Sequence, residues 1–320
     1  MTLLARLLRD WRLTLTAGAL LATLAALAAP QIVQQREARD LLLVVDVTGS
    51  MNVRDMDGRS RLAAAKEAAQ ALLAALPCQS RLGLGIFTER RTFLLFEPAE
   101  VCENFAAIDG AIDGLDWRMA WEGDSYVARG VHSALAIASS LDADLVFMTD
   151  GHEAPPLAAG TMPPFDGEPG RTEGVLVGIG GTEPVPIPKY NEDGRETGFY
   201  AESDVPQENR MGPPPEDAPT RAGWNPRNAP WGDEVAGGTE HLSSMKAEHL
   251  QSLASQTGLA FVPLEGPIAL STAVTQNTRP RLVEVAVDTA PLPAAAALGL
   301  LSILFAAAAL TSRRPERLPA

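Results

Sequence analysis

Short apolar runs divide the middle of this 320-residue chain, and most of them are followed by a stretch with the spacing of a helix. Five consecutive apolar residues at 41–45 need burial on both faces, which is typical of a strand inside a parallel sheet. The ranges that predict strands are 41–46, 81–87, 92–97, 144–149, 174–181 and 259–264. The ranges that predict helices are 60–76, 103–115, 127–140 and 240–257. This alternation predicts an α/β fold with a doubly wound, mostly parallel central sheet.

Two longer apolar runs, residues 13–29 and 292–310, flank this middle part. At a rise of about 1.5 Å per residue they would extend roughly 25 and 28 Å, close to the hydrocarbon thickness of a bilayer. Three Arg precede the first run and three follow the second, so the positive-inside rule predicts that both termini are cytoplasmic. We expect residues 1–30 to be a membrane anchor, with a cleaved signal peptide as the alternative, residues 291–312 to be a transmembrane helix, and residues 313–320 to be a basic cytoplasmic tail.

Charge follows the same division. The chain has a formal net charge of −14, and the residues outside 13–310 carry six Arg and two acids, so the remainder carries −18. A strongly acidic domain argues against nucleic acid or anionic lipid as its partner. The sequence therefore predicts a membrane-anchored protein whose middle part is exported and has no nucleic-acid partner.

The two cysteines lie beside a predicted hairpin. Residues 81–87 and 92–97 are two strands joined by a tight turn, so paired positions have residue numbers that add to about 179 to 180. Cys78 and Cys102 fit this register just beyond the strand ends, and an oxidising compartment would favour a disulfide between them. The hairpin would form the one antiparallel edge of the sheet. Two free buried thiols are the alternative.

Oxygen-bearing side chains follow the first buried strand at alternate positions: Asp46, Thr48 and Ser50. The carboxyl end of a strand is where ligands bind in an open α/β sheet. One carboxylate with hydroxyls, and without thiols or imidazoles, suits a hard divalent cation such as Mg²⁺. A simple helix cap is the structural alternative. A phosphatase of the haloacid-dehalogenase type would need a second Asp where Thr48 stands.

Two further loops carry similar chemistry, and a cation needs ligands from several loops. Asp150 follows the buried strand 144–149 at a Gly turn, and Ser125 lies in a turn that opens the helix 127–140. Asp124 is an alternative ligand in the second of these turns.

Together the three motifs resemble the metal-ion-dependent adhesion site of a von Willebrand factor type A (VWA) domain. The resemblance implies that Asp46, Ser50 and Ser125 contact the metal directly or through water, with Thr48 and Asp150 in the same shell or the next. Ser125 stands where the family usually has Thr, a mild departure that keeps the hydroxyl. The family's cation is Mg²⁺, with Mn²⁺ or Ca²⁺ as alternatives, and one open position accepts an acidic residue of a protein partner.

Within this family the chain is similar to short membrane-anchored bacterial members, the Bat-type proteins and the MxaC and MxaL type encoded with methanol dehydrogenase. The similarity spans about residues 36–265 and includes the segments Arg61-Leu-x-x-Ala-Lys66 and Val185-Pro-Ile-Pro-x-Tyr190. It implies an association with MoxR-type ATPases and help in maturing a periplasmic enzyme, such as assembly of a dehydrogenase or insertion of its Ca²⁺. The resemblance implies a place in the bacterial inner membrane, with the domain in the periplasm. Maturation of a periplasmic enzyme such as methanol dehydrogenase is the main expectation, and a Bat-type role in the envelope is the alternative.

The domain predicted at 31–265 contains an unusual stretch at 182–238 that is rich in Pro and Gly and has almost no apolar periodicity. It leaves the carboxyl end of the strand 174–181, so we expect it on the face of the metal site, with a short hairpin around Asp193-Gly194. The glycines at the end of 174–181 lead into loop, not into a helix, so they do not indicate a dinucleotide site. Residues 266–290 are expected to be a linker.

Trp117 and Trp121 stand just before the Ser125 loop, and their composition is typical of a protein interface. Packing of one or both indoles beneath the loop is the structural alternative. No His lies near a nucleophile in sequence except His152, beside Asp150, so we predict a binding module and not an enzyme. A metal-dependent hydrolase and a purely structural tether are the competing functions.

Overall fold

The computed structural model describes most of the chain, and it forms two compact units. One unit contains residues 37–281, and the other is made of the segments that precede and follow it. The described residues are 10–121, 123–158, 161–210, 213–227, 229–233 and 237–312. Of the predicted segments, the beginning of the N-terminal anchor and the tail 313–320, with most of the flanking Arg, lie outside the described residues.

The larger unit is built on a six-stranded sheet with the order β11-β6-β5-β2-β3-β4. Neighbouring strands are parallel except for β3 and β4, which confirms the predicted mostly parallel sheet with one antiparallel edge strand. Because β2 lies between β3 and β5, its carboxyl end lies between the ends of two neighbours. The strands are β2 (Asp40–Asp46), β3 (Arg81–Thr88), β4 (Arg91–Glu100), β5 (Asp144–Thr149), β6 (Gly174–Gly178) and β11 (Ala260–Pro263).

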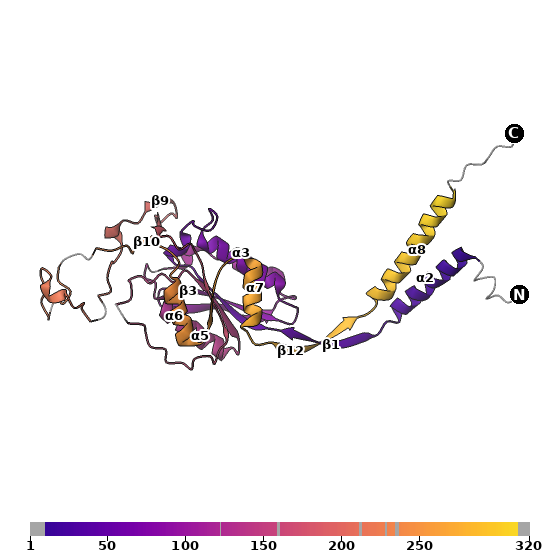
Figure 1. The fold of residues 1–320 in the computed structure, drawn as a ribbon, viewed down its shortest axis with the longest axis horizontal. Helices are drawn as coiled ribbons and strands as arrows, with labels where there is room; N and C mark the ends of the chain where they lie inside the picture. The colour runs from indigo at the N-terminus through magenta and orange to yellow at the C-terminus, as the bar shows by residue number, and fades with distance from the viewer. Residues whose placement is uncertain are drawn as a thin grey trace, which may run out of the picture. The chain divides into compact units, whose positions relative to one another are not determined.

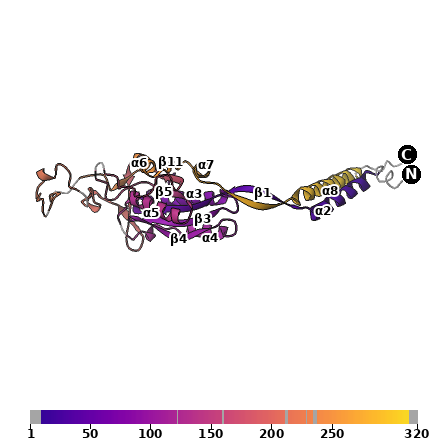
Figure 2. The same ribbon diagram turned by 90° about the horizontal axis from the view of Figure 1, so that it is seen from below.

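Helices cover both faces of this sheet and enclose two apolar cores (Figures 1 and 2). Successive side chains of β2 alternate between the cores, Leu43 in one and Val44 in the other, which is why its apolar run is continuous. The helices packed on the core of Leu43 are α3 (Arg61–Ala75), α4 (Phe105–Asp113) and α7 (Pro267–Gln276). Those on the core of Val44 are α5 (Val127–Ser140) and α6 (Ala247–Thr257).

The helices predicted at 60–76 and 127–140 are present as α3 and α5. The Ser60 hydroxyl caps α3 by accepting a hydrogen bond from the Ala63 amide at 3.1 Å, which satisfies one of the free N–H groups of the first turn. Pro77 follows the end of α3. The predicted range 60–76 thus exceeds the observed helix by one residue at each end.

The helix predicted at 240–257 begins later than expected. Its amino-terminal part is not helical, because Leu242 and Ser243 form strand β10 (Leu242–Ser243), which pairs antiparallel with β7 (Val185–Pro186). This pairing joins residues that are far apart in sequence, and it brings the two ends of the stretch 182–238 together. The spacing of apolar residues within 240–257 could not indicate that its first part pairs with β7.

Residues 266–290, expected to be a linker, contain regular structure. They include α7, whose Leu270 and Val274 are buried in the core, and strand β12 (Arg281–Asp288). Only ten residues long, α7 has too few turns for its apolar face to stand out beside Ser and Thr. The predicted end of the domain at residue 265 therefore falls short of the last core helix.

The stretch 182–238 is partly ordered by short pairings of its own. The predicted hairpin around Asp193-Gly194 is present, with β8 (Pro188–Tyr190) antiparallel to β9 (Glu196–Phe199). Two 3₁₀ turns follow at Glu202–Asp204 and Ala218–Thr220.

The smaller unit contains the two apolar helices, α2 (Trp11–Leu27) and α8 (Pro291–Ser312), which contact each other, and strand β1 (Gln31–Ala38) pairs with β12. Among the described residues, α8 is the helix long and apolar enough to cross a membrane, with a mean hydropathy of 2.1 over Pro291–Leu310. The apolar helix α2 is shorter, with 17 residues.

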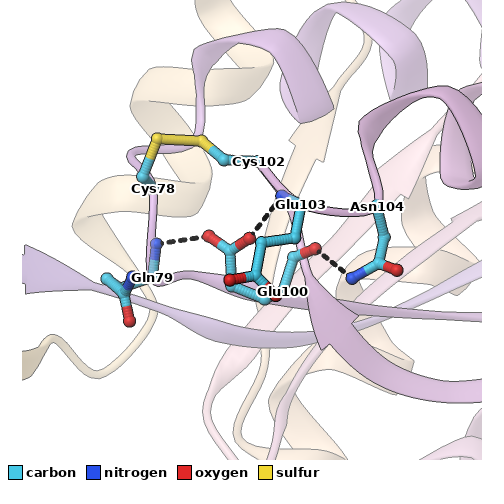
Figure 3. The surroundings of a disulfide bond; sticks show 6 residues. All are labelled: Cys78, Gln79, Glu100, Cys102, Glu103 and Asn104. Atoms are coloured by element: carbon cyan, nitrogen blue, oxygen red, sulfur yellow. Dashed lines mark hydrogen bonds between the residues drawn. A yellow bond between two sulfur atoms is a disulfide. The ribbon is translucent and has the colours of Figure 1, made fainter.

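The disulfide predicted between Cys78 and Cys102 is present, with the two Cα atoms 5.2 Å apart (Figure 3). Paired residues of β3 and β4 have numbers that add to 179 to 181, close to the predicted register, and irregularities near Leu84 account for the spread. Glu100 fastens the same corner. Its carboxylate accepts hydrogen bonds from the amides of Gln79 and Glu103, both at 2.6 Å.

Replacing both cysteines by Ser should lower the free energy of unfolding by about 3 kcal/mol, because the bond closes a loop between residues 24 apart in sequence. Urea titration of the full-length protein in detergent, followed by Trp fluorescence, measures this loss. Wild-type protein treated with a reductant is the control and should lose a similar amount. Equal midpoints for the oxidised wild type and the variant would contradict the prediction.

Candidate metal and partner site

Asp46 ends the central strand β2, and its carboxylate is fully buried. One carboxylate oxygen accepts hydrogen bonds from the Thr48 amide at 2.8 Å and the Thr48 hydroxyl at 2.7 Å. The other accepts from the Thr149 hydroxyl at 2.6 Å, across from the end of β5. Among the described residues Asp46 has no ion-pair partner, so its carboxylate is held by one amide and two hydroxyls.

The hydroxyls of Thr48 and Ser50 lie next to Asp46, 3.4 Å from each other. Both belong to the turn after β2, where a 3₁₀ helix (Gly49–Asn52) begins, and both are buried. Neither hydroxyl caps a long helix. The structure thus places this set of predicted residues together at one end of the sheet.

Ser125 is brought to the same place by backbone pairing. Its amide donates to the Ala154 carbonyl at 2.6 Å, and its carbonyl accepts from the Ala154 amide at 2.7 Å, which joins its loop to the segment after β5. The next amide, of Tyr126, donates to the Glu89 carbonyl at the turn between β3 and β4. The Ser125 hydroxyl is buried and has no hydrogen-bond partner among the described residues. Such an unsatisfied buried group is costly unless a ligand, ion or water meets it.

Asp150, the predicted ligand of the third loop, is turned toward a cation of the protein itself. Its carboxylate forms a fully buried ion pair with Arg61 at 2.6 Å and also accepts from the Ser243 hydroxyl at 3.2 Å. The other oxygen accepts from the His152 amide. Asp150 contributes negative charge close to Asp46, but its oxygens are already engaged.

Arg61 is the first residue of α3, and its side chain is buried completely. It donates to Asp55, Asp150 and Ser243, so each of its three nitrogens has an acceptor. Although burial alone lowers the pKa of Arg61, the two carboxylates raise it above its ordinary value.

Gly180 leaves the space that Arg61 occupies. A β-carbon at residue 180 would lie 2.5 Å from the Arg61 side chain, and the backbone there has φ +116°, which other residues rarely adopt. The neighbouring Gly181 amide donates to Asp55 at 2.8 Å. The glycines after β6 therefore serve the packing of Arg61.

The residues at the end of β2 fit a hard divalent cation. Burial, and after it the Asp150 carboxylate, raises the pKa of Asp46 to about 7, so an adjacent cation would favour the ionised form. The unpaired Ser125 hydroxyl and those of Thr48 and Ser50 would supply neutral oxygen ligands. Within the described residues no group of three His, Cys, Asp or Glu side chains is placed to hold a metal, so such a site would depend on these hydroxyls.

A cavity of about 380 Å³ opens on these loops. The predicted residues Asp124, Trp117 and Trp121 line it as well. Asp124 accepts a long hydrogen bond of 3.4 Å from the Tyr126 hydroxyl, so it remains close to the predicted ligands. The remaining lining residues are Thr48, Gly49, Ser50, Ala120, Gly123, Ser125, His152, Ala154, Ile187, Tyr200, Asp204, Val205, Pro206 and Glu240.

The two tryptophans differ in their surroundings. Trp117 is partly buried and stacks on Tyr190 of the insertion with ring centroids 4.6 Å apart. Trp121 is 55% exposed and meets the edge of Phe93 at 4.7 Å. Trp117 thus fastens the insertion, whereas Trp121 leaves much of its indole open to a partner.

His152 was considered from the sequence only as a candidate base, and its position is informative. It is 2% exposed, lines the cavity, and neither ring nitrogen has a hydrogen-bond partner in the described part of the chain. Burial lowers its pKa to about 4, so it is neutral at physiological pH and its 3.5 Å contact with Glu240 is not an ion pair there. The insertion lies on the face of the site, as expected from the strand that it leaves, because several of its residues line the cavity. Glu240 was not predicted there, because its proximity depends on the β7–β10 pairing.

The fold and this loop cluster define a doubly wound α/β domain with a hydroxyl-rich site at the carboxyl end of its central strand. A family profile described as von Willebrand factor type A domain matches residues 41–152, a range that begins in β2 and ends just after Asp150. This part of the chain is thus similar to von Willebrand factor type A domains. No curated protein matches it.

Solved structures resemble the chain at low identity. An aerotolerance-related membrane protein from Bacteroides fragilis, with multiple mutations to serine, is 14% identical, with a TM-score of 0.48 over 75% of this chain and 98% of that one. Proximal thread matrix protein 1 from the mussel byssus is 16% identical, with a TM-score of 0.31 over 41% of this chain and 34% of that one. A von Willebrand factor type A protein from Catenulispora acidiphila is also 16% identical, with a TM-score of 0.27 over 38% and 29%. Likenesses of this size say nothing about function.

Replacing Arg61 by Met should lower the free energy of unfolding by about 3–5 kcal/mol, since it leaves Asp150 and Asp55 without their buried cation. Arg59→Met is the matched control, because Arg59 is half exposed and pairs with Glu67 at the surface; it should cost less than about 0.5 kcal/mol. Urea unfolding of the full-length protein measures both. A similar small loss for the two variants would contradict the role assigned to Arg61.

Proposed function

We propose that this chain is a membrane-tethered VWA module that binds a divalent cation and through it holds an acidic group of a protein partner. Asp46, Thr48, Ser50 and Ser125 would hold the cation, with Asp150 close by and Asp124 as an additional ligand. Mg²⁺ is the cation we expect, and Mn²⁺ or Ca²⁺ are the alternatives.

One observation carries this proposal: the buried, unpaired hydroxyl of Ser125 shares a cavity with the hydroxyls of Thr48 and Ser50, beside the buried carboxylate of Asp46. A helix cap would leave Ser125 unexplained. When bound, the cation supplies a positive charge with an open coordination position that an anionic oxygen can occupy. The chain's own residues position that charge at the floor of the cavity.

A hydrolase is the weaker candidate. An activated nucleophile needs a base within hydrogen-bonding distance. His152 lines the cavity, but it has no hydrogen bond to any described hydroxyl. We therefore propose binding and not catalysis.

For the wider role we place the Bat-type function, in the bacterial envelope and together with a MoxR-type ATPase, before maturation of methanol dehydrogenase. The motifs around Arg61 and Val185 support both roles equally, and the Bat-type role requires no dedicated enzyme client. The periplasmic dehydrogenase remains the second candidate partner. Identification of the proteins retained by the full-length chain from solubilised membranes separates the two.

Mg²⁺ or Mn²⁺ should raise the melting temperature of the full-length protein in detergent, since a ligand at 100 times its Kd stabilises by about 2.7 kcal/mol. Asp46→Ala should abolish this rise, while Asp57→Ala, which removes a carboxylate that is 97% exposed, should keep it. Ser125→Ala and Asp124→Ala show which of the two is the ligand. Retention of partners in a pull-down should be lost with EDTA and with Asp46→Ala. An unchanged metal response in Asp46→Ala would refute the site.

We also propose that α2 and α8 both cross the inner membrane, with the VWA domain in the periplasm. A reporter that is active only in the periplasm should then work when fused after Pro30 or Asp288, and fail when fused after Arg317. The apolar helices, the disulfide and the basic flanks support this topology. Activity of the fusion after Arg317, or inactivity of the one after Asp288, would reverse it.

A further inference from the structure

The cavity at the candidate cation site is lined by both polar and apolar groups. The hydroxyls and Asp124 are polar, and aromatic and aliphatic groups come from two segments of the chain. The segment before Ser125 contributes Trp117, Ala120 and Trp121, and the insertion contributes Ile187, Tyr200, Val205 and Pro206. A volume of about 380 Å³ is roughly a dozen times the volume of a water molecule in the liquid, so it holds about two residues of a peptide and not a flat protein surface.

The apolar part of the cavity is held in place by specific contacts. Trp117 stacks on Tyr190, and Arg54 forms an ion pair with Glu196 at 2.5 Å, so both strands of the β8–β9 hairpin are fastened to the loops of the domain. The β7–β10 pairing fixes the two ends of the insertion. The wall is therefore a built feature of the domain.

His152 supplies a second polar contact point, apart from the cation. It is nine-tenths buried or more, it lines the cavity, and neither ring nitrogen is paired among the described residues. The two nitrogens of an imidazole can donate to or accept from the groups of a peptide backbone. An unsatisfied buried ring of this kind indicates a ligand group that meets it.

We propose that this cavity recognises a short peptide segment in which an acidic residue is followed directly by a large apolar residue. The acidic side chain meets the cation, the apolar side chain packs on Trp121 and the insertion, and His152 meets the backbone between them. This inference rests on the proposed function, because it needs the cation at Asp46.

The charges around the cavity favour an apolar second residue over an acidic or basic one. Asp124, Asp204 and Glu240 line the cavity and no described Lys or Arg does, so a second acid would be repelled. Asp204 already pairs with Lys189 at 3.0 Å, so its carboxylate is engaged within the domain and does not attract a basic residue. The aromatic and aliphatic lining residues therefore decide which second residue of the peptide binds best.

The test uses the full-length protein in detergent, saturated with Mg²⁺, and capped dipeptides as probes in isothermal titration calorimetry. Acetyl-Glu-Phe-amide should bind at least about tenfold more tightly than acetyl-Gln-Phe-amide, which lacks the charge, or acetyl-Glu-Gly-amide, which lacks the apolar side chain. Acetyl-Glu-Lys-amide should be as weak as the Gly peptide. EDTA should abolish binding of all the acidic peptides.

Substitutions at Trp121 and His152 test these two contacts separately. Trp121→Ala should reduce the preference for Phe over Gly about fivefold or more, and Trp224→Ala, in a part of the insertion that does not line the cavity, should leave it unchanged. His152→Gln, which keeps a donor and an acceptor, should retain more affinity for acetyl-Glu-Phe-amide than His152→Leu does.

The outcomes separate this inference from the proposed function. If Mg²⁺ still raises the melting temperature but the Phe, Gly and Lys peptides bind equally, the inference is overturned and the metal module stands. Tighter binding of the Lys peptide, or equal binding of the Gln and Glu peptides, also overturns it. If Mg²⁺ has no effect on the wild type, the proposed function fails first and the inference fails with it.

Discussion

The buried guanidinium of Arg61 is the interaction on which the arrangement of the site depends. It takes its place at the start of α3 and joins three separate parts of the chain: the loop at Asp55, the end of β5 at Asp150, and β10 at Ser243. Moving this charge out of water is costly, and the cost is offset because all three nitrogens have acceptors. Any displacement of one loop would leave a buried charge unpaired, so the loops are held in one register relative to the sheet.

Asp55 and Asp150 both pair with Arg61, whereas Asp46 has no such partner among the described residues. Asp150 has a cation of its own, whereas Asp46 next to it has only neutral donors, the Thr48 amide and two hydroxyls. Burial and the Asp150 carboxylate raise the pKa of Asp46 as a result. The protein thus tolerates a desolvated acid at the end of its central strand. Burial of this carboxylate destabilises the folded chain when no cation is bound, and a bound cation would recover that free energy. This gives a physical reason for a cation site at this point of a well-packed sheet.

Most of the fold could be predicted because apolar runs and turn residues act locally. The continuous run in β2 and the hairpin register that pairs Cys78 with Cys102 are properties of nearby residues. The start of α6 and the existence of α7 could not be predicted in this way, because β10 and α7 are defined by distant partners. The motif likewise indicated which oxygens would gather, but not that Arg61 would engage Asp150 or that His152 would lie unpaired in a cavity.

The β7–β10 pairing separates two tasks along the chain. Because the stretch between Pro186 and Leu242 begins and ends at one short ladder, its interior can change in length or composition without altering the sheet, Asp46 or the buried arginine. Each doubling of such a loop costs only about 0.6 kcal/mol in closure entropy. The candidate cation site at the end of β2 and the cavity-lining residues of the insertion can therefore evolve at different rates. The same cation site could then be combined with insertions that prefer different residues beside the acidic group.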